Sequence, residues 1–213
     1  MGTEMGLRES KKQETRRLIS DCATRLFIEQ GFEQTTIAEI ATAARVAKKT
    51  VTNYFPRKED LALDHYEVFT QGLARSVTER LPGEEPLTAL KRTFRTALLE
   101  HDPVVGFTGP AFARMVADSP TLAARLRELH DEREEALAAA LGAAVPDTTA
   151  AIAPRAAAAL ISAADRLLFR RIQELTLAGH DDDRIEAVLL TEADHLRALL
   201  GAALGNDPTG TAW

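Results

Sequence analysis

Helix start and stop signals divide the first third of the chain into short segments and leave little room for a sheet. Ser10 with Gln13 has the spacing of a capping box, which satisfies backbone N–H groups at a helix start. Gly31 readily adopts the left-handed conformation that ends helices. The sequence therefore predicts a first helix from Ser10 to about Gln30, after which Phe32 folds back on Phe27.

Two shorter helices are predicted next, joined by a tight turn at residues 43–45. Thr36 with Glu39 makes a second capping box, and Pro56 ends the later helix because a proline disfavours the α conformation of the preceding residue. At helical spacing the inward-facing apolar residues are Ile37, Ile40 and Ala41 in the earlier helix, and Val46, Val51 and Phe55 in the later one.

The rest of the chain also shows helical periodicity, and no strict apolar alternation persists long enough to indicate strands. Proline and glycine positions mark the loops between segments. We therefore predict an all-α fold, with further helices at 58–80, 87–101, 109–118, 121–143, 155–179 and 183–204.

Composition favours a protein of the cytoplasm. The chain has 213 residues, 45% of them apolar, and no run approaches the roughly 18 apolar residues of a membrane span. Its start lacks the apolar stretch of a secretory signal, and the single cysteine, Cys22, forms no internal disulfide and is expected in the core. We predict no cofactor and no metal site, because the acids after His180 are explained as a helix start.

Charge is divided unevenly along the chain, whose net charge is −6. Residues 1–58 hold 11 Lys and Arg against 7 Asp and Glu, a net +4, whereas the remainder holds 15 against 25, a net −10. A basic segment at residues 1–58, followed by an acidic remainder, suits contact with a polyanion through the basic segment alone. A chance surface fluctuation is the alternative.

The predicted helix before Pro56 carries the side chains that suit a DNA groove. Lysine reaches guanine O6 and N7, asparagine pairs with adenine, and hydroxyl groups bind phosphate oxygens. A solvated polar face is the alternative for such a helix. The outward-facing residues are Lys48, Lys49, Thr50, Thr52, Asn53 and Tyr54.

The segment TTIAEIATAARVAKKTVTNYFPRKEDL, residues 35–61, resembles the DNA-binding segment of the tetracycline-repressor (TetR) family of transcriptional regulators. The similarity begins in TRRLISDCATRLFIEQGFEQTT and covers about the first quarter of the chain. The resemblance implies a three-helix helix-turn-helix domain at the N-terminus and a larger helical domain for ligand binding and dimerisation. It also implies a repressor that a small molecule releases from DNA.

Carried over by position, the resemblance implies base or nearby phosphate contacts for Lys48, Lys49 and Thr50, and DNA-backbone contacts for Thr36, Thr52, Tyr54 and Lys58, with Asn53 as a further candidate. Three positions depart from the family pattern. Arg45 replaces a turn glycine, Ala47 a capping serine, and Arg57 a small polar cap, and each change costs about 1 kcal/mol of local stability. Arg45 and Arg57 either bind phosphates or are merely solvated.

We predict a helix-turn-helix domain at 1–57, a ligand-binding and dimerisation domain at 58–204, and a disordered tail at 205–213. Ordinary core packing is the alternative role for the apolar candidates of the ligand cavity. The candidate ligand-binding residues are Tyr66, Phe69, Phe94, Leu98, His101, Phe107, Phe112, Met115, Asp165 and Phe169, with Arg166 also expected nearby.

The last two predicted helices have small and apolar residues suited to a homodimer interface. Internal packing in a monomer is the alternative. The apolar stripe of the last helix comprises Ile185, Val188, Leu189, Leu196, Leu199, Leu200 and Leu204.

With the family resemblance, we expect a regulator that binds a palindromic DNA operator as a dimer and is released by a small apolar or amphipathic effector. We expect no enzyme, because motifs for nucleotides, nucleophiles or paired metal ligands are missing. Two alternatives are a dimeric DNA-binding protein without a ligand and an all-helical enzyme.

Overall fold

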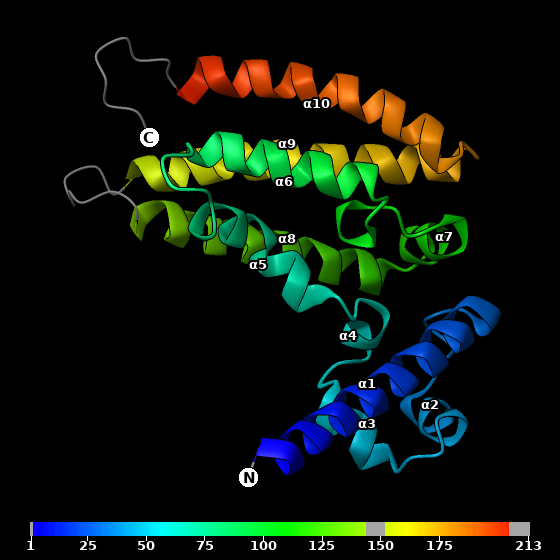
Figure 1. Ribbon diagram of the computed structural model, residues 1–213. Coiled ribbons are helices and arrows are strands. Elements are labelled where there is room, and N and C mark those ends of the chain that lie inside the picture. The colour runs from blue at the N-terminus through cyan, green and yellow to red at the C-terminus, as the bar shows by residue number, and fades with distance from the viewer. Residues whose placement is uncertain (1, 144–151, 205–213) are drawn as a thin grey trace. The chain divides into compact units, whose positions relative to one another are not determined.

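The computed structural model describes residues 2–143 and 152–204, with side chains from Ser10 onward (Figure 1). Within these residues every regular element is a helix, which confirms the predicted all-α class. The predicted tail, 205–213, lies outside the described residues. The elements are α1 (Gly2–Gln30), α2 (Ile37–Ala43), α3 (Lys48–Tyr54), α4 (Lys58–Ala62), α5 (Tyr66–Thr78), α6 (Pro86–Leu99), the 3-10 turn η1 (Pro103–Val105), α7 (Pro110–Asp118), α8 (Pro120–Ala143), α9 (Ile152–Leu177) and α10 (Asp182–Leu204).

The chain forms two compact units. Among the described residues, unit 1 comprises 2–66 and 114–126, and unit 2 comprises 67–113, 127–143 and 152–204. Unit 1 thus extends past residue 57, the predicted end of the first domain. It also takes in the end of α7 and the first residues of α8, a long-range association that local periodicity does not reveal.

Unit 1 has a core where α1 packs against the short helices that follow it. The side chains that are at most 1% exposed include Phe27, Ile40, Val51 and Phe55. Leu61 of α4 is also fully buried. The Phe27 and Phe32 ring centroids lie 5.0 Å apart, so the predicted return of the chain after Gly31 is confirmed. Cys22 is buried, as expected.

The predicted single helix at 58–80 was wrong, because α4 ends at Ala62 and α5 begins at Tyr66. Leu63 leaves the helical conformation with φ −109° and ψ 50°. Tertiary contacts to Asp64 stabilise this break: the Ser20 hydroxyl donates to its carboxylate, and Arg16 donates to its carbonyl oxygen. No proline or glycine marks the break, so the sequence offered no local signal for it.

In unit 2, α10 lies along α9 and α6 (Figure 1). One core cluster centres on Val77, Leu137 and Ala158, and a second on Leu98 and Ile172. Ile185 and Leu189 are fully buried in the second cluster. Their predicted place on a dimer surface was therefore wrong, because their own chain already covers them.

No helix in the described part of the chain is both long and apolar enough to cross a membrane.

Candidate functional site

The turn between α2 and α3 is fixed at both of its ends. Thr36 caps α2: its side-chain oxygen accepts from the Glu39 backbone N–H at 3.2 Å, and its own N–H donates to Glu39 Oε2 at 2.7 Å. Donation to the Glu39 carboxylate from the Thr36 backbone N–H, and next from the Thr36 hydroxyl, lowers the pKa of Glu39. After α2 the backbone N–H of Val46 donates to Ala41 O at 2.9 Å, so the predicted capping box and tight turn are both present.

Arg45, in this turn, has φ 53°, the left-handed conformation that suits glycine. The cost that the sequence predicts for a non-glycine turn residue therefore applies here. Ala47 and Arg57, the N-cap residues of α3 and α4, make no side-chain cap hydrogen bond, so both predicted cap losses are also present. The Arg45 side chain is exposed and remains a candidate for phosphate contact.

Helix α3 buries one face and exposes the other. Val51 is fully buried and Phe55, just after the helix, is 1% exposed. The opposite face therefore carries polar groups that are accessible to a partner. Lys48, Lys49, Thr52 and Asn53 are exposed, and Thr50 and Tyr54 are half-buried.

Lys58 has an internal role in unit 1. Its Nζ donates to Thr35 O at 2.9 Å and to Glu33 O at 3.3 Å, and it lies 4.2 Å from the centroid of the Phe32 ring. An ammonium group has three N–H donors, so one remains for a phosphate oxygen. Lys58 thus ties α4 to the loop before α2, and its predicted DNA contact stays a prediction.

Arg16 of α1 is a positioning residue that the sequence did not single out. Its Nη1 donates to the carbonyl oxygen of Tyr54 at 3.1 Å and its Nη2 to that of Asp64 at 3.4 Å. The guanidinium carbon lies 4.4 Å from the centroid of the Phe55 ring. Arg16 therefore holds the C-terminal end of α3 against α1 and the α4–α5 break. Only tertiary structure reveals this, because 38 residues separate Arg16 from Tyr54.

Two polar anchors join the start of α8 to the rest of unit 1. The Ser119 hydroxyl donates to Glu33 Oε1 at 2.6 Å and accepts from Leu122 N–H, which caps α8. The hydrogen bond from Ser119 is the main cause of a lowered pKa for Glu33, and hydrogen bonds from Thr121 lower it further. Arg125 Nε donates to Asp60 Oδ1 at 3.2 Å, and both side chains are under 10% exposed.

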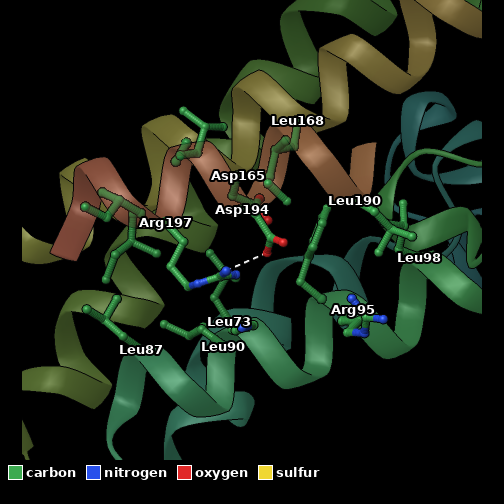
Figure 2. A pocket seen from close by; sticks show the side chains of 17 residues that line it. Leu73, Leu87, Leu90, Arg95, Leu98, Asp165, Leu168, Leu190, Asp194 and Arg197 are labelled. Carbon is green, nitrogen blue, oxygen red and sulfur yellow. Dashed lines mark hydrogen bonds and ion pairs between the residues drawn. The ribbon is translucent and has the colours of Figure 1, made fainter. Parts of the chain in front are cut away.

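Unit 2 contains a cavity of about 100 Å³ between α6 and α10, floored by α9 and one residue of α5 (Figure 2). Three of the predicted ligand-binding residues, Phe94, Leu98 and Asp165, line it. Leucine is the most frequent residue type in the wall, with 8 of the 17 lining residues. The other lining residues are Leu73, Leu87, Leu90, Lys91, Arg95, Ile161, Ala164, Leu168, Leu190, Ala193, Asp194, Leu196, Arg197 and Leu200.

The remaining predicted ligand-binding residues do not line this cavity. Phe69 and Phe169 make edge-on contacts with His130, at centroid distances of 5.0 and 5.5 Å. His101 stacks on Phe107 and lies 3.0 Å from the Glu186 carboxylate. The others lie elsewhere: Phe112 is half-buried in unit 2, whereas Tyr66 and Met115 belong to unit 1.

A buried ion pair sits beneath the cavity. Asp165 accepts from Arg133 Nη2 at 3.3 Å, and Arg133 Nε lies 3.1 Å from the second carboxylate oxygen without the alignment of a hydrogen bond. Arg133 also donates to the Phe69 carbonyl oxygen. The negative charge of Asp165 is thus neutralised within the protein. Arg166, expected near the ligand, instead pairs with Asp131 and Glu134 on α8.

His130 is 5% exposed beside this ion pair. Burial, with smaller contributions from Arg166 and Arg133, lowers the pKa of His130 to about 4, against the opposing effect of Asp165. The imidazole is therefore neutral at physiological pH.

One segment of unit 1 matches a known family of regulators. Residues 19–64 match the family described as bacterial regulatory proteins, tetR family. The transcriptional regulator TcmR of Streptomyces glaucescens is 33% identical over 143 residues, which cover 65% of this chain and 63% of TcmR. AcrR of Shigella flexneri is 35% identical over 86 residues, covering 39% of this chain and 40% of AcrR. The chain thus spans less than two thirds of the length of these curated relatives.

Solved structures resemble the chain over most of its length. A TetR-family regulator from Streptomyces coelicolor aligns with a TM-score of 0.53 and 24% identity, covering 88% of this chain and 95% of that one. GusR of Salmonella enterica aligns with a TM-score of 0.54 and 20% identity, covering 90% and 95%. At these identities the likeness is one of fold.

Proposed function

Because residues 19–64 match the TetR family of bacterial regulatory proteins, we propose that the chain is a regulator of this family that represses transcription by binding a palindromic DNA operator as a homodimer. A small apolar or amphipathic effector in unit 2 releases the DNA. The main support for the proposal is the exposed polar face of α3, whose opposite, apolar face is buried against the rest of unit 1. DNA contacts are assigned to Lys48, Lys49 and Thr50 for bases, and to Thr36, Thr52, Tyr54 and Lys58 for phosphates.

The second copy is proposed to pack on the outer face of α9. Leu160 and Leu167 lie seven residues apart on one face of that helix and are 44% and 47% exposed. Ala156 and Ala163 are exposed on the same face, and small residues allow another helix to approach closely. Leu199 of α10, 67% exposed, is the residue of the predicted apolar stripe that stays most available to a partner.

Effector control requires only that the ligand prefer one of two conformations of the dimer. A coupling free energy of about 1 to 3 kcal/mol changes operator affinity by roughly 5- to 150-fold. The cavity between α6 and α10 is the proposed ligand site, because it combines an apolar wall with a few charged groups.

Selection of bound sequences from a random DNA pool tests the whole proposal. A palindrome with half-sites about one helical turn apart is the expected result, since each recognition helix enters one major groove. Repeating the selection with a metabolite library tests release. Failure to enrich any palindrome contradicts the operator proposal. Enrichment that no metabolite reverses favours a DNA-binding dimer without an effector.

Lys48→Ala is expected to relax base preference at one position of each half-site and to weaken operator binding roughly tenfold. One good side-chain contact to a base contributes about 1–3 kcal/mol of discrimination. Fluorescence anisotropy with operators carrying single base changes measures both effects. Arg75→Ala, an equal charge change at an exposed residue of unit 2 outside the cavity, is the matched control. An unchanged preference profile would remove Lys48 from the proposed base contacts.

Arg16→Ala is expected to weaken operator binding about tenfold although Arg16 need not touch DNA. The variant loses the donors to Tyr54 O and Asp64 O and the contact with Phe55, so α3 loses a fixed orientation. Arg16→Lys keeps the charge but cannot reproduce the fork of two donors, and should remain impaired. Full binding by Arg16→Lys with loss in Arg16→Ala would indicate a charge effect on DNA instead. Exposed Arg17 provides the control, Arg17→Ala.

A further inference from the structure

The cavity in unit 2 has a mouth with an excess of positive charge. Lys91 and Arg95 lie one turn apart on α6, both line the cavity and both are exposed. Neither makes a hydrogen bond or ion pair with the residues that the structure describes. Arg92, between them in sequence, is instead held by both carboxylate oxygens of Glu84 at 2.9 Å. Two cations of α6 therefore remain available at the mouth.

The acidic groups around the cavity are already neutralised. Asp194 on α10 forms an ion pair with Arg197 of the same helix, and Figure 2 shows the two side chains joined by a dashed line between α10 and α6. Asp165 is paired with Arg133 below. The pKa of Asp194 is lowered mainly by Arg197 and further by Lys91 and Arg95, so all three cations act at the same place.

We propose that this cavity binds an amphipathic anion, whose short apolar part enters among the leucines and whose acidic group pairs with Lys91 and Arg95. This inference rests on the proposed effector site and names the chemistry of its ligand. The apolar wall includes Leu90, Leu98, Leu168 and Leu190. A carboxylate or a phosphate satisfies the charge requirement equally.

A cationic ligand fits less well. It would have to displace Arg197 from Asp194 or Arg133 from Asp165, and each displacement leaves a cation without its carboxylate. It would also meet Lys91 and Arg95 at the mouth. The volume of about 100 Å³ limits the buried part to a short chain or a small ring unless the leucines move.

Calorimetric titration of the full chain with hexanoate, hexanamide and hexylamine tests the charge preference, because the three share one tail. Hexanoate should bind at least tenfold more tightly than the other two, and its advantage should shrink as salt rises from about 0.05 to 0.5 M. Hexyl phosphate should behave as hexanoate does. Equal affinity for all three compounds, or tighter binding of hexylamine, would overturn the proposal.

Exposed side chains allow the mouth to be altered without disturbing the core. The double variant Lys91→Gln, Arg95→Gln should lose about tenfold in hexanoate affinity while its affinity for hexanamide stays the same. Arg75→Gln, an exposed residue of α5 outside the cavity, is the matched control and should bind as the parent does. A double variant that binds hexanoate normally would also overturn the assignment of the two cations.

A separate measurement distinguishes this inference from the proposed function. If hexanoate binds through Lys91 and Arg95 but leaves the protein–operator complex intact at saturation, the ligand class stands and effector release is contradicted. If only neutral or cationic molecules release the operator, release stands and the anion preference is contradicted.

Discussion

Asp60→Ala is expected to lower the free energy of unfolding by about 3 kcal/mol. Asp60 and Arg125 form an ion pair in unit 1 in which both side chains are under 10% exposed. Removing the carboxylate leaves the guanidinium buried without that partner, which costs more than the intact pair contributes. Urea unfolding, followed by circular dichroism at fixed protein concentration, measures the loss.

Glu59→Ala separates the buried pair from a general effect of acids at a helix start. Glu59 and Asp60 both lie in the first turn of α4, so both interact with the helix dipole, but Glu59 is only half-buried. Its replacement should cost under about 1 kcal/mol. The double variant Asp60→Leu, Arg125→Met should regain much of the stability, because no charge is left buried. Equal losses for both single variants would contradict the special role of the pair.

Stability should also fall steeply between pH 6.5 and 4 because of His130. Its pKa is about 4 in the folded protein, and an unfolded histidine titrates near 6.5. Below pH 6.5 the unfolded chain therefore takes up a proton that the folded chain does not. The stabilisation is complete above pH 6.5 and is lost at about 1.4 kcal/mol per pH unit, for a total of about 3 kcal/mol at pH 4.

His130→Gln is expected to flatten this part of the pH profile, whatever it does to stability at pH 7. Glutamine has no charge to gain, so the unfolded state loses its proton-linked advantage. His195→Gln, on the exposed side of α10, is the control and should keep the slope of the parent. Unfolding measured in urea at half-unit pH steps gives the comparison. A parent profile that is flat between pH 6.5 and 5 would contradict a buried neutral imidazole.

Local sequence signals predicted the helices well because capping and helix ends depend on neighbours in the chain. The Thr36 capping box, the stop at Gly31 and the end of α3 before Pro56 all involve residues within four positions of one another. The break at Leu63 depends on Ser20 and Arg16 instead. A partner more than forty residues away leaves no periodic trace, so the break was missed.

The same distinction separates the two candidate sites. The outward face of α3 follows from helical spacing, so the exposure of Lys48, Lys49, Thr52 and Asn53 could be predicted. The cavity of unit 2 is assembled from four helices, and an aromatic residue carries no local mark that it lines a cavity instead of a core. Phe94 lines it, whereas Phe69 and Phe169 pack around His130. Lys91 and Arg95 were missed because ordinary exposed cations look the same in sequence.

The positive φ of Arg45 has a consequence for engineering the turn. Arg45→Gly would relieve a backbone strain of about 1 kcal/mol, but glycine gives the unfolded chain more freedom, which offsets about 0.5–1 kcal/mol of that gain. The free energy of unfolding is thus expected to differ little between arginine and glycine at this position. The charge at residue 45 can therefore be removed by Arg45→Gly with little change in the melting temperature. Tuning the charge of the helix-turn-helix surface at residue 45 is therefore separable from tuning its fold.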